Sequence, residues 1–289
     1  MSNVDGAGAN LYTAQQAQAA EAQVWSAHEA ARLRTMGMLV ASVTEADLAP
    51  IFTEMTPTDG TRLRFIDIGA GSDTTTEELC DAAGVEYTAL DGKEDFLEGR
   101  STEPSRKILA DVGDIPRPDG SYDVTFSRAV TAWQEHPRGS IAEQLRVTRL
   151  GGVAVFTEFD WTHSGAVAGS PGEAAIMTAR SIMMLALSTA KFKPDFGAQL
   201  GKCIDEVVEG QAINAQRTEV RHDLPSGDYT ALFLDAAQNV LLQLRATGRG
   251  QAAVLAGLLE DSLVKIEAAG SCLIRLPALV TQIVRPTLP

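Results

Sequence analysis

The sequence predicts an α/β fold, in which a mostly parallel sheet is covered by helices on both faces. Short apolar and β-branched runs alternate with helical patterns between residues 62 and 160, and this alternation is typical of a parallel sheet. The first run ends in the glycine turn Gly69-Ala70-Gly71, after which a helical segment opens. Later runs end in acidic or hydroxyl side chains, at the strand ends where such sheets bind their ligands.

Five strands are expected in this region, at residues 65–68, 87–90, 107–110, 122–127 and 153–157. A helix should begin near Asp73, where threonine or aspartate side chains can cap free N–H groups. A short helix should start at Gly92. A longer one should run from Ser140 to Leu150, where Gly151-Gly152 would stop it.

The rest of the chain is expected to hold more helices and two further strands. The helical patterns lie at residues 171–191, 196–208, 229–246 and 251–268. A sixth strand is expected at residues 215–222, and a last, antiparallel strand at residues 272–284. The helices between these two strands would form an insertion that either roofs a ligand cleft or only stabilises the fold.

The N-terminal segment is expected to be helical. Residues 1–8 read as a disordered leader, and residues 12–43 are rich in helix formers. They form either a helical pair packed on the main domain or a lid over the ligand. Four side chains are candidates to face the ligand: Tyr12, Trp25, His28 and Arg34. Pro50, Pro57 and Gly60 mark a linker before the first strand.

Composition and charge narrow the possible partners. Acidic residues outnumber basic ones by 38 to 24, and the formal net charge of −14 repels nucleic acid and anionic membranes. Cys80, Cys203 and Cys272 lie far apart, which excludes a disulfide framework and a cysteine metal site and suits a reducing cytoplasm. No targeting pattern or membrane-spanning apolar run is expected. We expect a cytoplasmic protein with a small-molecule ligand, and a homodimer through the helical insertion is compatible with the sequence.

The glycine turn and the acid that follows it predict nucleotide binding. Gly69 and Gly71 let the backbone approach a ligand closely. Asp91 follows about 20 residues later at the end of the next strand, where a carboxylate grips a pair of ribose hydroxyls. The alternative is a tight turn that binds no ligand. A dinucleotide fingerprint needs a third glycine, whereas Asp73 puts a negative charge where a pyrophosphate would sit, which argues against NAD or FAD.

A set of motifs in a fixed order carries a family resemblance. They are Phe65-Ile66-Asp67-Ile68-Gly69-Ala70-Gly71, Ala89-Leu90-Asp91, Ala110-Asp111, Pro118-Asp119-Gly120-Ser121-Tyr122-Asp123, Ser127-Arg128-Ala129-Val130 and Leu145-Arg146-Val147-Thr148-Arg149-Leu150-Gly151-Gly152. Over residues 62–160 the chain resembles class I S-adenosylmethionine-dependent methyltransferases, of the small-molecule branch that includes the ubiquinone and menaquinone methyltransferases.

This resemblance implies a Rossmann-like, doubly wound, mostly parallel seven-stranded sheet with a helical N-terminal lid and a helical insertion before the last strand. It also implies three parts of the chain. They are the lid at residues 1–61, an S-adenosylmethionine-binding core at 62–160, and a helical substrate-capping region with the last two strands at 161–289.

The resemblance assigns eight positions to the cofactor: Asp67, Gly69, Gly71, Asp91, Asp111, Val112, Ser127 and Arg128. The first three would meet the methionine part, and the backbone of the last two would lie near the methionine amino group. Asp91 would hold the ribose hydroxyls. Asp111 would accept a hydrogen bond from the adenine amino group, beside the Val112 backbone, with Asp114 as an adjacent competitor.

One position departs from the family pattern. Asp73 stands where the family usually has a third glycine. Its carboxylate would either repel the cofactor carboxylate or point away and cap the helix.

The resemblance implies transfer of a methyl group to an oxygen, nitrogen or carbon atom of a small, largely apolar molecule, such as a secondary metabolite or a quinone. Alignment of the reactants is the main requirement, and a general base helps with a hydroxyl, phenol or acidic carbon. His163 is the first candidate base, since it follows the fifth strand, and His136 is the second, since it follows the helix that begins at Val130 after the fourth strand. Glu158 and Asp160 are alternatives as base or metal ligand, although no metal-ligand spacing occurs and no metal is expected.

Two other functions stay open. The chain could bind the cofactor and catalyse a cyclisation or rearrangement, which the charge of Asp73 keeps in view. It could also be a non-catalytic binding protein, although acids retained at three strand ends count against this. A dehydrogenase is disfavoured by the missing glycine.

Overall fold

The computed structural model describes residues 27–98, 100, 102–189, 192–211, 213–248 and 250–287. The predicted leader and first lid helix, with Tyr12 and Trp25, lie outside these residues, as does the side chain of His28. The chain forms two compact units. The sheet unit holds Ala30–Ser164, Lys191–Ser226 and Arg275–Pro289, and the helical unit includes Gly165–Ala190 and Gly227–Ile274. The three-part division expected from the sequence stays a prediction.

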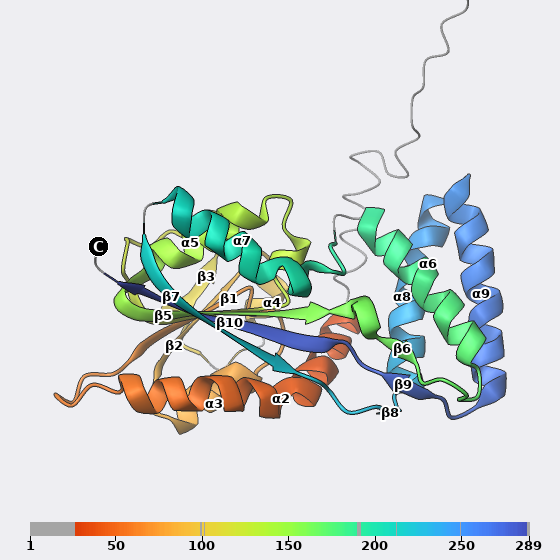
Figure 1. Cartoon of the computed structure of the whole chain (residues 1–289), viewed down its shortest axis with the longest axis horizontal. Helices are drawn as coiled ribbons and strands as arrows, with labels where there is room; N and C mark the ends of the chain where they lie inside the picture. The colour runs from red at the N-terminus through yellow and green to blue at the C-terminus, as the bar shows by residue number, and fades with distance from the viewer. Residues whose placement is uncertain are drawn as a thin grey trace, which may run out of the picture. The chain divides into compact units, whose positions relative to one another are not determined.

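The sheet unit is built on a seven-stranded sheet in the order β3-β2-β1-β4-β5-β10-β7 (Figure 1). The strands are β1 Arg64–Ile68, β2 Glu86–Asp91, β3 Lys107–Leu109, β4 Tyr122–Arg128, β5 Thr148–Asp160, β7 Asn214–His222 and β10 Ala278–Thr287. β1 to β5 pair in parallel, and β10 pairs antiparallel with both β5 and β7. The predicted α/β fold with a doubly wound, mostly parallel seven-stranded sheet is therefore confirmed.

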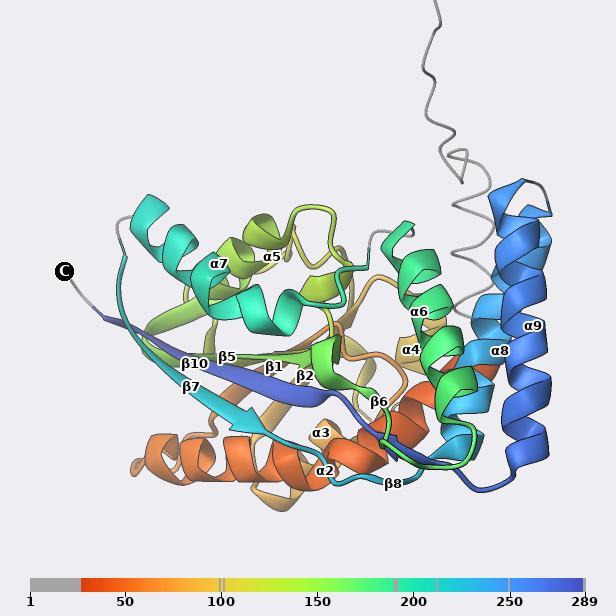
Figure 2. The same ribbon diagram turned by 45° about the vertical axis from the view of Figure 1, so that its right-hand side comes forward.

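Helices cover both faces of this sheet, as Figures 1 and 2 show. One layer holds α2 Ala27–Met55, α3 Thr75–Ala82 and α4 Glu94–Glu98, and the other holds α5 Pro137–Val147 and α7 Phe196–Gly210. Successive residues of β1 face opposite layers. Phe65 packs edge-on against Phe52 of α2, with ring centroids 5.6 Å apart, whereas Ile66 packs in a core with Val147 of α5. Strands buried on both faces explain why the sequence reads as near-continuous apolar runs.

The predicted end of the helix at 140–150 is wrong. α5 ends at Val147, and β5 already includes Gly151 and Gly152. Gly151 has a φ of +71°, and a Cβ on Gly152 would lie 2.7 Å from the Asp123 carbonyl oxygen. The pairing of β4 with β5 is irregular at this point. The glycine pair therefore allows the irregular pairing at the start of β5 and does not cap the helix.

Two other boundaries also differ from the prediction. Pro50 does not begin a linker but lies inside α2, where buried Leu48, Ile51 and Phe52 compensate for the hydrogen bond that proline cannot make. The segment expected as one last strand is divided. Its first part, β9 Leu273–Arg275, joins a separate small sheet, and β10 begins only at Ala278.

The helical unit contains α6 Glu173–Thr189, α8 Thr230–Thr247 and α9 Gln251–Ala269. These helices share one apolar core, in which Ile176, Leu241 and Leu259 are buried. A small sheet of β6 Gly165–Ala166, β9 and β8 Gly227–Asp228 completes the unit. Among the described helices, none is long and apolar enough to cross a membrane.

The strand order reverses between β1 and β4. From β1 the chain continues outward through β2 and β3, whereas β4 and β5 extend in the other direction. In open α/β sheets, ligands bind at the carboxyl ends of the strands beside such a reversal. We therefore expect the functional site at the carboxyl ends of β1, β2 and β4.

Candidate active site

The predicted cofactor residues all lie on the carboxyl edge of the sheet, at or just after the ends of β1, β2, β3 and β4. The N–H of Gly71 donates to Asp91 Oδ2 at 2.8 Å, which joins the turn after β1 to the end of β2. The N–H of Ala70 also donates to the Leu90 carbonyl at 2.9 Å. The structure thus brings the glycine turn and the acid of the second strand into direct contact.

The two glycines of the turn have different tasks. Both have positive φ, +69° at Gly69 and +60° at Gly71, a conformation that favours glycine. A Cβ on Gly69 would lie 2.4 Å from Val130 Cγ2, so this glycine lets the turn pack against the loop after β4. A Cβ on Gly71 would meet no atom within 4 Å, so one side of this residue is open.

Asp91 is buried but retains free acceptor positions. Its Oδ2 accepts from Gly71 and its Oδ1 accepts from the N–H of Lys93 at 2.9 Å. Burial raises the pKa of Asp91, and these two hydrogen bonds counteract part of the rise. A carboxylate has about four acceptor positions, and two are used by the backbone. The others could accept the two hydroxyls of a ribose, so the geometry fits the predicted role.

Asp67 lies beneath the turn in a buried polar group. Its Oδ2 accepts from the Tyr87 hydroxyl at 3.0 Å. Burial raises the pKa of Asp67 to about 6, while the charges of Arg100 and Arg128 lower it. Asp67 is therefore linked through Tyr87 to Arg100, which binds the carbonyls of the turn.

Arg100 organises the turn and was not among the residues predicted for the site. Its Nη2 donates to the carbonyl oxygens of Ala70 at 2.6 Å, Gly71 at 3.0 Å and Asp73 at 2.6 Å. Its Nη1 donates to the Tyr87 hydroxyl at 2.7 Å. Because these partners lie far from Arg100 in the sequence and are mostly backbone atoms, no local motif could reveal the role.

The Asp73 carboxylate is turned to the start of α3, where Thr74 is the N-cap residue and Asp73 bonds the first helical residue, close to the second of the two alternatives expected from the sequence. Its Oδ1 accepts from the N–H of Thr75 at 3.0 Å and from the Thr75 hydroxyl at 2.6 Å. Its Oδ2 forms an ion pair with Arg128. The negative charge that interrupts the glycine pattern is therefore paired within the protein.

The end of β4 is shaped by Ser127, Arg128 and Ala129. Arg128 also donates to the Thr44 hydroxyl at 2.7 Å, so its side chain is turned toward α2 and α3. Ala129 has a φ of +56°, the only positive value for a non-glycine among the described residues. The Ser127 hydroxyl is buried without a hydrogen-bond partner among the described residues. Such strain and unsatisfied polarity gather at functional sites.

The adenine candidates follow β3. Asp111 is exposed, and its Oδ1 accepts from the N–H of Gly113 at 2.7 Å. Val112 is buried in the core that also holds Ile68 and Leu90. The competing Asp114 is exposed, and its N–H donates to the Asp111 carbonyl at 3.1 Å. The three residues thus form one turn at the carboxyl edge.

The two candidate bases, His163 and His136, are both exposed. Nδ1 of His163 lies 3.0 Å from the Thr162 hydroxyl, in the short helix that follows β5. His136 precedes α5 and its side chain makes no capping hydrogen bond. No hydrogen bond links either histidine to the eight cofactor candidates among the described residues. His222, in contrast, lies 2.8 Å from a carboxylate oxygen of Asp47 on α2.

Glu158 and Asp160, the alternative bases, are held by the protein itself. Glu158 Oε1 accepts from the N–H groups of Val130 at 3.1 Å, Thr131 at 2.6 Å and Ala132 at 3.3 Å. Burial nonetheless raises the pKa of Glu158 to about 7. Burial would also raise the pKa of Asp160, but hydrogen bonds from Thr162 and Arg221 outweigh it and lower the pKa. In the described part of the chain, no three His, Cys, Asp or Glu side chains gather to hold a metal ion.

Aromatic side chains gather at the end of β5, after β4 and β5, and before α7. The ring centroids of Trp133 and Phe192 are 4.5 Å apart, and those of Phe159 and Trp161 are 5.7 Å apart. The N–H of Trp161 donates to the Pro194 carbonyl at 3.1 Å, so the segment before α7 meets the loop after β5. The sequence signal was only the proximity of these aromatics to strand ends.

Known proteins match the segment that carries these residues. Residues 66–156 match a family described as a methyltransferase domain. A demethylmenaquinone methyltransferase of Renibacterium salmoninarum is 37% identical over 99 residues, which are 33% of this chain and 41% of that protein. A malonyl-(acyl-carrier protein) O-methyltransferase of Serratia marcescens is 32% identical over 105 residues, 31% of this chain and 41% of that protein. The chain thus spans less than half the length of these curated relatives.

A solved structure shares the fold over most of the chain. A proposed methyltransferase from an antibiotic biosynthesis pathway of Anabaena variabilis aligns with a TM-score of 0.51 and 15% identity, covering 83% of this chain and 97% of that one. At this identity the likeness concerns the fold alone. The family match, the strand order and the glycine turn agree: residues 66–156 match a methyltransferase domain, and the resemblance to class I S-adenosylmethionine-dependent methyltransferases is confirmed.

Proposed function

We propose that the protein is an S-adenosylmethionine-dependent methyltransferase that acts on an oxygen, nitrogen or carbon atom of a small, largely apolar molecule. The contact between Gly71 and Asp91 carries this proposal, because it places an open glycine beside a carboxylate with acceptor positions to spare. The fit extends to Asp73, whose charge Arg128 neutralises, so the departure at this position does not leave a bare carboxylate beside the methionine part of the cofactor.

Each predicted residue has a task that its position supports. Asp91 would accept from the ribose hydroxyls, and the exposed Asp111 would accept from an adenine amino group beside Val112. The backbone of Ser127 and Arg128 would bind the methionine amino group, since the Arg128 side chain is occupied by Asp73 and Thr44. S-adenosylmethionine, when bound, supplies a methyl group already activated on a sulfonium, so the main task left to the protein is alignment.

The aromatic loops support an apolar and flat acceptor. Trp133, Phe159 and Trp161 are each half-buried, and they lie after β4, at the end of β5 and just after β5, on the same edge as the cofactor candidates. Aromatic rings favour offset stacking on other flat rings. Of the two relatives described above, one is named for demethylmenaquinone and the other for a malonyl-carrier protein. The aromatic loops favour a quinone-like or aromatic secondary metabolite over a charged carrier.

His163 stays our first candidate for the general base and His136 the second. Both are solvent-exposed: His163 lies in the short helix after β5, and His136 lies just before α5. Replacing His163 with alanine should slow methyl transfer to a phenolic acceptor and leave cofactor affinity intact.

A cytoplasmic homodimer is also part of the proposal. The helical unit exposes four large apolar side chains on α8 and α9: Leu242, Val254, Leu258 and Val264. Exposed apolar groups of this kind often mark an interface. Light scattering after size exclusion would distinguish a dimer of 30.7 kDa chains from a monomer.

The alternative is a protein that binds the cofactor but catalyses a cyclisation or rearrangement, or that only binds. The alternative rests on the negative charge of Asp73. Because Arg128 pairs with that charge, the support for the alternative is weaker. Calorimetric titration with S-adenosylmethionine, S-adenosylhomocysteine and NADH separates the possibilities when combined with a labelled methyl donor. Binding of the adenosyl ligands with labelled product supports the proposal. Binding without transfer to any aromatic acceptor favours the alternative, and NADH binding alone contradicts both.

A further inference from the structure

The connection between β3 and β4 leaves part of the sheet uncovered. Parallel strands usually connect through a crossover helix, yet residues 110–121 contain none. This loop must cross β2 and β1, because β3 lies at the edge of the sheet. Val112 and Ile115 pack on Ile66 and Leu90. The first residues of β1, β2 and β4 line an open pocket of about 190 Å³ instead, at the edge opposite to the cofactor candidates.

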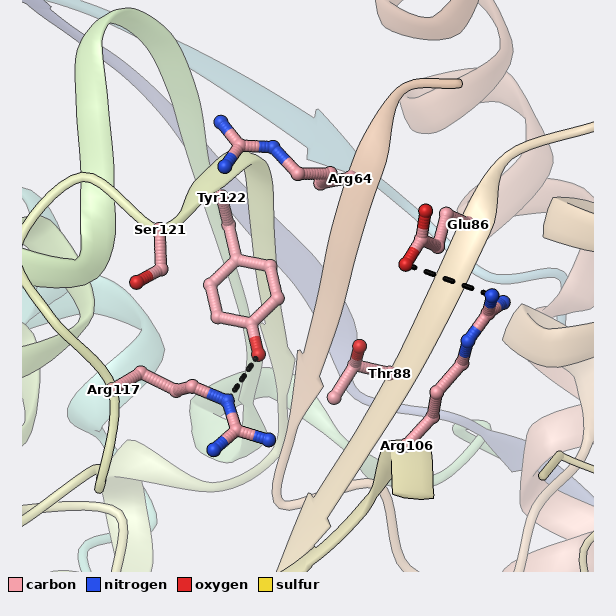
Figure 3. Close-up of a pocket in the computed structure, with 7 residues that line it drawn as sticks. All are labelled: Arg64, Glu86, Thr88, Arg106, Arg117, Ser121 and Tyr122. Atoms are coloured by element: carbon pink, nitrogen blue, oxygen red, sulfur yellow. Dashed lines mark hydrogen bonds and ion pairs between the residues drawn. The ribbon is translucent and has the colours of Figure 1, made fainter. Parts of the chain in front are cut away.

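Three arginines are among the residues that line this pocket: Arg64, Arg106 and Arg117. The other lining residues are Glu86, Thr88, Ser121 and Tyr122 (Figure 3). In Figure 3 Arg117 reaches Tyr122 from one side of β1, and Arg106 reaches Glu86 on the other. Such a concentration of guanidinium groups is notable in a chain with a net charge of −14.

The acids nearby neutralise these arginines only in part, since Arg64 and Arg106 each have a carboxylate partner. Among the described residues, the Arg117 side chain donates only to neutral acceptors, the Tyr122 hydroxyl at 3.3 Å and the Pro116 carbonyl at 3.2 Å. Arg106 lies 3.6 Å from Glu86. Arg64 binds Asp123 at 3.2 Å, but Asp123 also accepts from Arg149 at 2.5 Å. Four guanidinium groups thus face two carboxylates.

The floor of the pocket offers a polar group without a protein partner. Thr88 is only 7% exposed, and its hydroxyl has no hydrogen-bond partner among the described residues. The hydroxyl oxygen is not among the fully buried polar atoms of the described residues, so it is accessible from the pocket that it lines. It lies within the same pocket as the three arginines and could donate to a bound oxyanion.

The loop that carries Arg117 is fixed in place. Arg146 donates to the carbonyls of Ile115 at 3.0 Å and Arg117 at 2.9 Å. Arg146 also binds Asp119 and Glu143, so these two acids have their own partner. A pinned loop holds Arg117 at the pocket without loss of order on binding.

We propose that this arginine pocket binds a phosphate group, either as inorganic phosphate or as the end of a phosphorylated small molecule. The planar guanidinium suits the oxygens of phosphate, and the volume suits one such group. This second site is independent of the proposed methyl transfer and lies at the other edge of the sheet.

Calorimetric titration of the full chain with inorganic phosphate and with glycerol 3-phosphate, at constant ionic strength, tests the proposal. We expect saturable binding by the wild type. Arg117→Gln should bind at least about tenfold more weakly, because a charge-assisted hydrogen bond is lost, and Thr88→Val should bind several-fold more weakly. Arg138→Gln is the matched control, since Arg138 is exposed and bound to Glu206 outside the pocket.

Circular dichroism of each variant shows whether it has folded. Equal affinity for the two anions identifies inorganic phosphate as sufficient, and at least tenfold tighter binding of the ester identifies a phosphorylated metabolite. Absence of saturable binding by the wild type would overturn the proposal. So would equal weakening by Arg117→Gln and Arg138→Gln, because that result would reflect net charge alone.

Discussion

Asp73 is a buried acid whose charge is balanced by its neighbours. Its carboxylate binds Thr75 and Arg128, and α2 approaches it so closely that a Cβ on Gly37 would lie 2.2 Å from Asp73 Cγ. The Asp73 side chain, which stands where the family has a glycine, is therefore accommodated in three ways. Thr75 donates to its carboxylate, Arg128 balances its charge, and Gly37 of α2 leaves room for it. Removing one partner of such a buried pair costs more than the pair itself contributes, because the other charge stays buried.

Asp91 should be the residue on which cofactor affinity depends most. Asp91→Asn removes the charge from a group that would accept two ribose hydroxyls, and should weaken S-adenosylhomocysteine binding by about 1–3 kcal/mol. Calorimetric titration measures the change. Asp95→Asn, at an exposed position of α4, is the control and should bind as the wild type does. Unchanged affinity in Asp91→Asn would remove the ribose assignment.

Glu158 should make stability depend on pH. Glu158 is 1% exposed, and burial raises its pKa to about 7. In the unfolded chain, the pKa of a glutamate is about 4.3. Between these values the folded protein holds a proton that the unfolded chain has lost. The free energy of unfolding should therefore fall as pH rises from about 4.5 to about 7, by up to about 3 kcal/mol.

Glu158→Gln stays neutral and should lose this part of the slope. Urea unfolding at pH 5 and pH 8 measures it, with exposed Glu94→Gln as control. Asp67, whose pKa burial raises to about 6, should leave a residual slope in every variant. An identical pH dependence in Glu158→Gln and the wild type would contradict the prediction.

At the scale of elements, α2 is attached to the sheet by polar contacts as well as by its apolar face. Thr44 accepts from Arg128, and Asp47 binds His222 at 2.8 Å and accepts from the Thr281 hydroxyl at 2.7 Å. Asp47 is buried, so these bonds fix the position of the helix as well as satisfying the acid. α2 thereby joins β4, β7 and β10, three strands far apart in the sequence.

A pair of helical glycines tests how closely α2 packs. Gly37→Ala would place a Cβ 2.2 Å from Asp73 Cγ, and should lower the free energy of unfolding by about 1–3 kcal/mol. Gly257→Ala, inside α9, would meet no atom within 4 Å and should raise it by about 0.5–1 kcal/mol. Urea unfolding of both variants measures the difference. Equal changes in the free energy of unfolding would show that α2 lies further from Asp73 than it does in this structure.

The elements that the sequence predicted well are those whose pattern is local. The strands of the parallel sheet are buried on both faces, so short apolar runs mark them directly. The glycine turn and Asp91 follow from their spacing. Pro50 and Gly151-Gly152 were misread because burial and strand pairing override the usual preference of proline and glycine. Arg100 and the Asp47–His222 pair could not be predicted, since their partners come together only in the folded chain.

At the scale of the whole molecule, the acidic charge is unevenly distributed. The chain carries 14 more acids than bases, yet three arginines line one pocket at the amino edge of the sheet, and buried acids support the carboxyl edge. The field of the whole chain would repel a polyanion, whereas a small phosphate group can enter a local positive pocket. The two edges thus suit ligands of different charge.

The two proposed sites should therefore stabilise the fold independently. A ligand at about 100 times its dissociation constant stabilises the folded state by about 2.7 kcal/mol, and two ligands at separate sites should add. Thermal unfolding with S-adenosylhomocysteine, with phosphate and with both measures the increments. Asp91→Asn should lose only the first increment and Arg117→Gln only the second, because the residues lie at opposite edges of the sheet. If either variant lost both increments, the ligands would share one site or the sites would be coupled through the loop of residues 110–121, which reaches from Asp111 to Ser121.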